Sequence, residues 1–203
     1  MRNERGLITV DFLFSIVLVM GLFALMFVVT FTLSVASVTQ YITFAAARNY
    51  SPAHIDQESQ ARMGSEKYLE LTNHDVFKPL YRNGWFRVDD EPNIGDHTQI
   101  IPEFQGATGG VNKFWGVGTS FTAMVLDFKI PFFGSTAPDS DGSGEGFKTY
   151  MASYLGREPT TEECLRFTAA RWDAIRKLAV SDGAGYSSGT SSSGYYPQTD
   201  DGC

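Results

Sequence analysis

The sequence is poor in the residues from which most metal centres and catalytic sites are built. Its 203 residues include only two cysteines, Cys164 and Cys203, and three scattered histidines. No CxxC pair, zinc-ligand spacing or HExxH motif is present. No Ser/His/Asp or Cys/His arrangement is evident either, although the many acidic residues leave a glycosidase pair open. We therefore expect the chain not to be an enzyme.

Basic residues are outnumbered by acidic ones. There are 16 Lys and Arg against 23 Asp and Glu, which gives a net charge of −7 and a pI near 4.9. A surface that binds nucleic acid needs clustered Lys and Arg to contact the phosphates, and the sequence has no such cluster. The composition therefore argues against a nucleic-acid partner.

Charge is almost missing from the N-terminal quarter. Asp11 is the only charged residue between Arg5 and Arg48. The run from Leu7 to Leu33 is apolar all round a helix, and about 20 such residues cross a bilayer. A removable secretory signal has a shorter apolar core, typically about 7–15 residues. The run therefore predicts a retained transmembrane helix. The basic residues before it predict a cytoplasmic N-terminus and an extracytoplasmic remainder.

The short segment before this run suggests a processing site. If the chain is cut after Gly6, Leu7 becomes a new N-terminus and Asp11 becomes the fifth residue of the mature helix. The new amine and the Asp11 carboxylate then lie one turn apart and can neutralise each other, within a subunit or between neighbours. Alternatively, Asp11 lies near the helix start and reaches the membrane interface, where a charge costs little.

This N-terminus resembles the class III signal of type IV pilin-like proteins. Their signal combines a short basic leader, a terminal Gly, an apolar helix and an acid at the fifth mature position. Those families usually carry Glu at that position, and the Tad branch commonly follows it with Tyr, whereas this chain has Asp11 and Phe12. The stretch from Gln40 to Arg48 is similar to the same part of TadE-like pseudopilins. The resemblance covers residues 1–50 only.

The resemblance implies a set of partners and a location. A prepilin peptidase would cleave between Gly6 and Leu7, and Asp11 and Phe12 would serve assembly. The other partners would be pilin or pseudopilin subunits, an inner-membrane assembly platform and the membrane itself. The chain would reside in the bacterial inner membrane with its C-terminal domain extracytoplasmic, and at the cell surface or in a pilus after assembly.

The expected organisation is a leader (1–6), a transmembrane and stalk helix (7–50) and an extracytoplasmic domain (51–203). The helix should continue past the membrane because residues 34–49 contain no Gly or Pro. From residue 7 to residue 49 it would extend roughly 65 Å at about 1.5 Å per residue. The expected fold class is α+β.

Local signals divide the domain further. Ser51-Pro52 marks a break or restart of the helix. The expected elements that follow are a helix over 53–71, short strands over 78–118, a strand over 121–133, and a helix over 160–180. Thr160 and Glu163 fit a capping box at the start of the last helix. An apolar stripe through Leu165 and Trp172 should dock that helix on the domain.

An acidic turn carries part of a calcium-binding pattern. Asp139, Asp141 and Ser143 occupy positions 1, 3 and 5 of an EF-hand-like loop, and Glu145 adds another carboxylate. Position 12 is Tyr150, where the bidentate Glu should stand. The segment is therefore expected to be either a calcium site or a solvated acidic turn. Calcium is the one cofactor that the sequence leaves open.

The C-terminal stretch from Asp182 to Cys203 is rich in Gly, Ser and Tyr, and alone it should be disordered. An exported chain with two cysteines favours a disulfide, here between Cys164 and Cys203. The bond would stabilise the fold by roughly 4 kcal/mol on the chain-entropy model. Many pilins tie their C-terminal segment in this way. The alternative is two free thiols.

Two function classes follow from these observations. The first is a structural subunit, a TadE-like minor pseudopilin of a Tad or type IV pilus or a related secretion filament. The second is a membrane-anchored extracytoplasmic binding or adhesin domain that does not polymerise. Processing after Gly6 separates the two classes.

Overall fold

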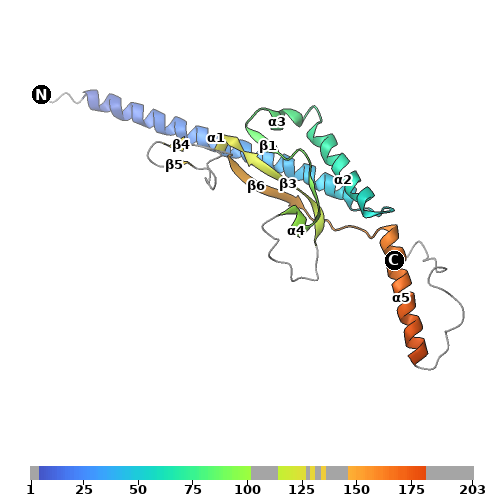
Figure 1. Cartoon of the computed structure of the whole chain (residues 1–203). Coiled ribbons are helices and arrows are strands. Elements are labelled where there is room, and N and C mark those ends of the chain that lie inside the picture. The colour runs from blue at the N-terminus through green and yellow to red at the C-terminus, as the bar shows by residue number, and fades with distance from the viewer. Residues whose placement is uncertain (1–4, 102–113, 127–128, 131–133, 136–145, 182–203) are drawn as a thin grey trace. The chain divides into compact units, whose positions relative to one another are not determined.

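The computed structural model describes residues 5–101, 114–126, 129–130, 134–135 and 146–181 (Figure 1). It contains a long N-terminal helix, further helices and antiparallel strand pairs, so the predicted α+β class is confirmed. In chain order the elements are α1 (Arg5–Tyr50), α2 (Gln57–Thr72), α3 (Lys78–Arg82), β1 (Phe86–Val88), β2 (Asn93–Asp96), α4 (His97–Ile100), β3 (Trp115–Ala123), η2 (Met124–Leu126), β4 (Lys129–Ile130), β5 (Gly134–Ser135), β6 (Phe147–Ser153) and α5 (Thr161–Ser181).

Two compact units share the long elements of the chain. The first comprises Met1–Ile42, Leu71–Asp90 and Thr119–Met151, and the second comprises Thr43–Glu70, Glu91–Gly118 and Ala152–Cys203. Helix α1 and strand β3 each contribute residues to both units.

Helix α1 is continuous from Arg5 to Tyr50, as the lack of Gly and Pro after Gly21 predicts. It ends where expected, and the Ser51 amide still donates to the Ala47 carbonyl at 2.9 Å. No new helix begins at Ser51-Pro52. Helix α2 begins at Gln57 because the Asp56 carboxylate accepts a hydrogen bond from the Ser59 amide at 2.7 Å and so caps the helix.

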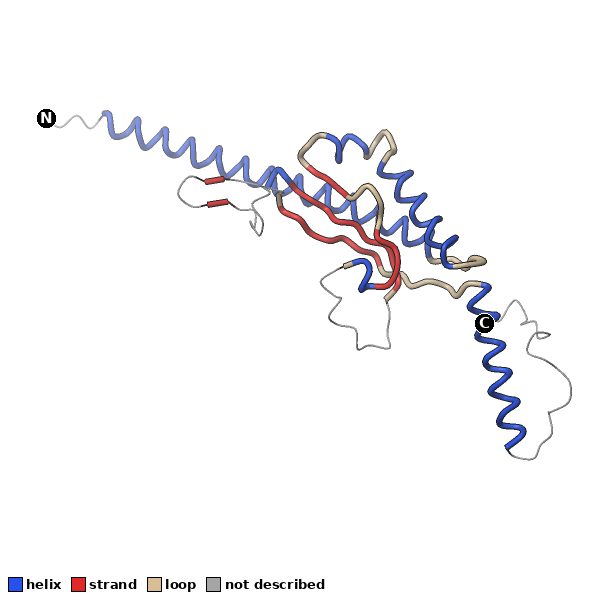
Figure 2. The backbone as a smooth tube through the Cα atoms, in the orientation of Figure 1, coloured by secondary structure: helices blue, strands red, loops and turns tan. Residues whose placement is uncertain are grey.

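The main sheet has the strand order β1-β3-β2, and β6 also pairs with β3 (Figure 2). Strand β1 is antiparallel to β3, with Phe86 opposite Ala123, and β2 is antiparallel to the first half of β3, with Asp96 opposite Trp115. The expected strand over 121–133 is therefore placed too late. Strand β3 ends at Ala123, opposite Phe86, the first residue of β1, and Met124 turns away to donate its amide to the Trp85 carbonyl at 2.8 Å.

The core of the first unit lies between α1 and the sheet. Val35 of α1 is buried in one cluster with Phe86, Phe121 and Ala123. The Phe86 and Phe121 rings stack with their centroids 5.7 Å apart, and Phe31 meets Phe86 edge to face at 5.3 Å. Stacked and edge-to-face rings add to the free energy of burial. The part of α1 around Val35 thus belongs to the core of the first unit.

In the second unit, α2 approaches α1 closely at a glycine. A Cβ on Gly64 would lie 3.1 Å from the Tyr50 Cβ and 3.2 Å from the Ile94 side chain. Gln60, Gly64 and Tyr68 are all buried and recur every fourth residue, so they form one face of α2. Glycine at the centre of this face allows the two helices to pack, and α2 belongs to the fold although its sequence is mostly polar.

Helix α5 spans Thr161–Ser181, close to the predicted 160–180. The expected apolar stripe does not pack against the domain at the start of α5, because Leu165 is exposed. The buried residue there is Thr168, whose hydroxyl donates to the Cys164 carbonyl at 2.7 Å. The side chain of Trp172 lies outside the described residues.

Candidate functional site

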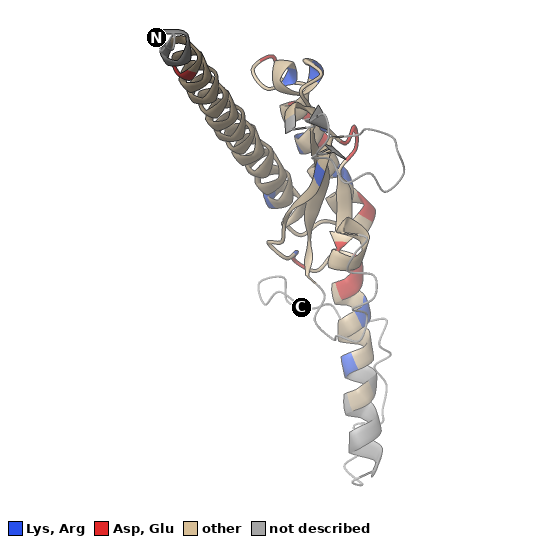
Figure 3. Ribbon diagram, turned by 90° about the vertical axis from the view of Figure 1, so that its left-hand side faces the viewer, with Lys and Arg blue, Asp and Glu red and all other residues tan. Residues whose placement is uncertain are grey.

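The N-terminal half of α1 is an apolar cylinder that no other part of the described chain covers. Its large side chains point outward around the whole circumference, and Phe14 (74% exposed) and Phe23 (71% exposed) are examples. Figure 3 shows this helix almost without charge along its length. The helix is long and apolar enough to cross a membrane, and none of the most apolar stretch is buried. The predicted transmembrane segment is confirmed to that extent.

The C-terminal half of the same helix has a buried stripe. Its buried residues recur every three or four positions and are Thr32, Val35, Thr39, Ile42, Thr43, Ala46, Ala47 and Tyr50. The Thr39 and Tyr81 hydroxyls lie 3.0 Å apart within hydrogen-bond distance, and burial raises the pKa of Tyr81. One continuous helix therefore acts as an exposed apolar segment at one end and as a core element at the other.

The residues predicted for processing and assembly all lie on α1. Gly6 and Leu7 are in its first turn. The side chains of Asp11 and Phe12 are exposed, and the Ser15 hydroxyl donates to the Asp11 carbonyl at 2.8 Å. Among the described residues, no ion pair neutralises the Asp11 carboxylate. An exposed carboxylate on an apolar helix is costly in lipid unless a cation meets it.

A clamp of polar residues holds the start of α5 in the second unit. The Arg157 guanidinium donates to both oxygens of Glu163, at 2.7 and 2.6 Å, and lies 4.4 Å from the centre of the Trp115 ring. The Thr160 amide donates to Glu163, and the Glu163 amide donates to the Thr160 hydroxyl. These reciprocal bonds confirm the predicted capping box. The Arg157–Glu163 ion pair is bidentate and largely shielded, because the Arg157 side chain is only 10% exposed.

Gln60 connects this clamp to the loop that follows α1. Its buried amide nitrogen donates to the Pro52 carbonyl at 2.9 Å and to the Glu158 carbonyl at 2.8 Å. The Glu158 amide in turn donates to the Ser51 carbonyl at 2.8 Å. These bonds satisfy buried backbone groups that would otherwise be unpaired. They fix α5 to the end of α1, and their role is structural.

Weakening of the clamp should be visible as a pH-dependent effect. The hydrogen bond from Arg157, followed by that from the Thr160 amide, lowers the pKa of Glu163 from 4.5 to about 2. The stabilisation is therefore complete above about pH 4.5 and is lost as the pH falls toward 2. We expect Glu163→Gln to speed amide hydrogen exchange over residues 157–168 at pH 6, and this difference from the wild type should shrink near pH 3.

Comparison of the two proteins at the same pH removes the intrinsic pH dependence of exchange. Glu162→Gln is the matched control, because the Glu162 ion pair with Arg166 is a surface contact that contributes little. Equal protection of the wild type and Glu163→Gln at pH 6 would contradict a stabilising clamp.

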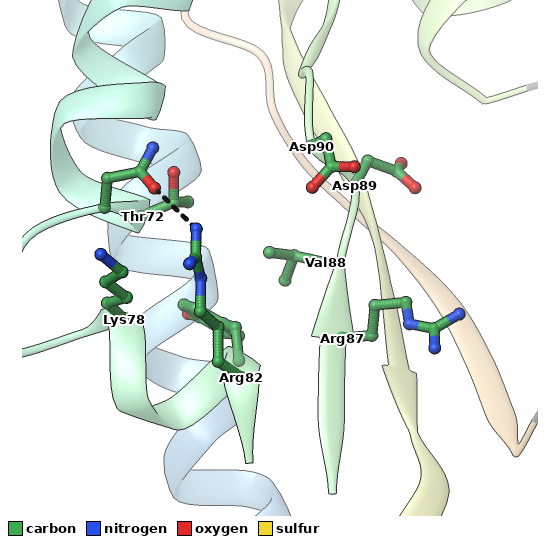
Figure 4. A pocket seen from close by; sticks show the side chains of 9 residues that line it. Thr72, Lys78, Arg82, Arg87, Val88, Asp89 and Asp90 are labelled. Carbon is green, nitrogen blue, oxygen red and sulfur yellow. Dashed lines mark hydrogen bonds between the residues drawn. The ribbon is translucent and has the colours of Figure 1, made fainter. Parts of the chain in front are cut away.

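A polar cleft opens between α3 and β1 in the first unit. Its volume is about 350 Å³, and its lining is Thr72, Asn73, Lys78, Tyr81, Arg82, Arg87, Val88, Asp89 and Asp90. In Figure 4, Lys78 and Arg82 extend from α3 while Val88 and Asp90 point toward them, and Arg87 points to the other side of β1. Arg82 donates to the Asn73 side chain at 3.4 Å. The cleft thus presents cationic groups on one wall and a carboxylate on the other.

Asp89 forms hydrogen bonds with strand β3 of the sheet. Its carboxylate accepts the Ser120 amide at 2.7 Å and also the Ser120 hydroxyl. The Asp89 amide donates to the Thr119 hydroxyl at 3.3 Å. These bonds tie the end of β1 to β3, and they give Asp89 a positioning role.

The predicted calcium ligands, Asp139, Asp141, Ser143 and Glu145, lie outside the described residues. Within the described ranges, no three His, Cys, Asp or Glu side chains gather in a way that could hold a metal ion. The calcium hypothesis therefore stays a prediction.

Only one cysteine of the predicted disulfide lies among the described residues. Cys164 lies in the first turn of α5, whereas Cys203 lies outside the described residues. No free cysteine is found among the residues that the structure describes. We expect a non-reducing peptide map of the protein isolated from cells to recover Cys164 and Cys203 in one linked pair. Alkylation of both thiols without reductant would contradict the bond and leave the C-terminal segment untied.

The sequence predicts processing and assembly residues on α1, and that stays a prediction; it does not predict the contacts of Arg157, Trp115 and Gln60. These positions carry no local motif, and only the fold brings them together. The capping box at Thr160 was the one sequence signal for the polar clamp at the start of α5. No family model, curated protein or solved structure matches this chain.

Proposed function

We propose that this chain is a pilin-class structural subunit, a TadE-like minor pseudopilin of a Tad or type IV pilus or a related secretion filament. In this proposal a prepilin peptidase removes residues 1–6 on the cytoplasmic side. The apolar half of α1 then anchors the subunit in the inner membrane, with residues 51–203 on the extracytoplasmic side. The chain acts by assembly with other subunits and with an inner-membrane platform, and not by catalysis.

The observation that carries the proposal is the continuity of α1. The helix runs without interruption from its exposed apolar half into a stripe that is buried in the domain, and Val35 at the start of this stripe is only 2% exposed. A receptor or enzyme that merely needs tethering can use a flexible linker. A subunit that assembles through its membrane helix needs that helix to set the position of its domain. A force or contact on the helix must be transmitted to the domain.

The second candidate is a membrane-anchored binding domain or adhesin that does not polymerise. The cleft between α3 and β1 favours it, since Lys78 and Arg82 face Asp90 across a volume of about 350 Å³. Such a cleft suits a small ligand with separated charges. The two candidates differ in processing, because a simple anchor keeps its leader whereas a pilin-class subunit loses it.

Gly6→Lys should abolish removal of the leader while leaving the chain in the membrane. A peptidase that cuts after a terminal Gly must fit that residue in its site, and a long cationic side chain does not fit there. The apolar run after Leu7 is unchanged, so insertion is expected to be normal. The readout is the electrophoretic mobility of the membrane-fraction protein in cells with and without the peptidase.

Gly21→Ala is the matched control for this substitution. It changes a glycine of the same helix at a position where a new Cβ meets nothing within 4 Å. Its processing should equal that of the wild type. Identical mobility of the wild type, Gly6→Lys and a peptidase-deficient sample would show that no leader is removed and would favour the binding-domain alternative.

A further inference from the structure

The first unit presents an exposed tryptophan beside the membrane helix. Trp85 is 51% exposed, and its ring meets the Phe31 ring edge to face with the centroids 6.1 Å apart. Phe31 in turn stacks on Phe27, whose side chain is 67% exposed. An aromatic ladder therefore leads from the apolar surface of α1 to the edge of the domain.

The backbone holds Trp85 firmly in this place. Its amide donates to the Asn83 side chain at 2.8 Å, and its carbonyl accepts the Met124 amide at 2.8 Å. Gly84, which precedes it, has a φ of +81°, a conformation that favours glycine. The exposure of this large apolar ring is thus built into the turn between α3 and β1.

The position of Phe31 along α1 corresponds to the outer membrane interface. About 20 helical residues cross the hydrocarbon core, and counted from Leu7 these end near Met26. Phe31 lies five residues further, or roughly 7.5 Å along the axis at about 1.5 Å per residue. The headgroup layer on each side is about 5–7.5 Å deep, so Phe31 lies at its outer edge. Trp85, which packs against Phe31, therefore falls at the level where Trp is enriched in membrane proteins.

The segment around Trp85 contains basic and exposed apolar side chains, and Asp75, Asp89 and Asp90 flank it. Residues 76–88 contain the basic residues Lys78, Arg82 and Arg87 and no acidic residue, although the whole chain has a net charge of −7. Val76 is 66% exposed on the same segment. Aromatic side chains are enriched at both membrane–water interfaces, so the exposed Trp85 fits the outer one.

We propose that the segment of residues 76–88 contacts the headgroup layer of the outer leaflet, with Trp85 inserted at the interface as a second membrane contact of the domain. This inference rests on the proposed membrane anchoring by α1. The contact fixes the depth and tilt of the domain relative to the bilayer, because Trp85 packs against Phe31 of the membrane helix. A single helix alone would leave the domain free to tilt over the bilayer.

Quenching of tryptophan fluorescence by brominated lipids tests this contact in the full chain. The chain is placed at low protein-to-lipid ratio in phosphatidylcholine–phosphatidylglycerol vesicles with bromine near the headgroup end or near the methyl end of the acyl chains. We expect a blue-shifted component that shallow bromines quench more strongly than deep ones. Trp85→Phe should remove this component, whereas Trp115→Phe, which also removes one tryptophan, should retain it.

Flotation of the vesicles separates the two proposals. If the chain floats with the vesicles but Trp85→Phe leaves lipid quenching unchanged, the interface contact is wrong while the anchoring survives. If the chain does not float, both are wrong. A blue-shifted component that brominated lipids do not quench, and that disappears on dilution of the protein in the membrane, would show that Trp85 contacts a second copy and not lipid, and it too would overturn the inference.

Discussion

Asp11→Ala is expected to abolish incorporation of the chain into a filament or subunit complex while leaving its domain folded. In the proposed mature subunit, Asp11 is the fifth residue and meets the new Leu7 amine of the same or a neighbouring chain. At 4 Å and an effective dielectric near 20, this attraction is roughly 4 kcal/mol before the cost of desolvation. Removal of the carboxylate leaves a buried amine without a partner in the assembled state.

The domain should fold as in the wild type, because the Asp11 side chain contacts none of the described core residues and lies on the exposed half of α1. Co-purification with tagged partner subunits measures incorporation, and limited proteolysis measures folding. Asp11→Glu keeps the charge and should retain assembly. Ser15→Ala, one turn away, removes only a hydroxyl that bonds to the Asp11 carbonyl and serves as the control. Normal incorporation of Asp11→Ala would contradict the charge-pairing account.

Phe121→Ala is expected to cost about 3–5 kcal/mol of unfolding free energy, the range for truncation of a buried aromatic residue. Phe121 is 2% exposed and stacks on Phe86 in the cluster that includes Val35 of α1. The loss should loosen the attachment of α1 to the sheet as well as the sheet itself. Urea titration in detergent, followed by proteolytic sensitivity of the domain, measures the effect.

Phe147→Ala provides the matched control on β6. Its ring is 47% exposed, so its removal should change stability by only about 0.5 kcal/mol, as for most surface substitutions. If Phe121→Ala unfolded at the same urea concentration as Phe147→Ala, the cluster would not be the core that holds α1 to the sheet.

Helices α1 and α5 were predictable because their signals are local, whereas α3 and α4 lie where short strands were expected. The apolar run and the absence of Gly and Pro after Gly21 predict α1 to within one or two residues of its end at Tyr50. The capping box at Thr160 predicts the start of α5 in the same way. Both signals depend on residues within one or two turns of each other, so the rest of the fold does not alter them.

The strands and the clamp were less predictable because distant residues decide them. The alternation from Phe121 onward is typical of a strand, yet β3 ends at Ala123, because its partner β1 begins opposite that residue, with Phe86, and extends no further along β3. Burial of Leu165 was expected from its place on an apolar stripe, but the structure leaves it exposed. The contacts of Arg157 with Glu163 and Trp115 likewise arise only when separate parts of the chain meet.

The mass of the mature N-terminus tests the central claim most directly. The chain is extracted from membranes of cells with an active prepilin peptidase, digested and sequenced by mass spectrometry. The account predicts an N-terminal peptide that begins at Leu7, with residues 1–6 missing and Asp11 at the fifth position. A protein that still begins at Met1 in those cells would contradict the assignment to the pilin class and leave α1 as a plain membrane anchor.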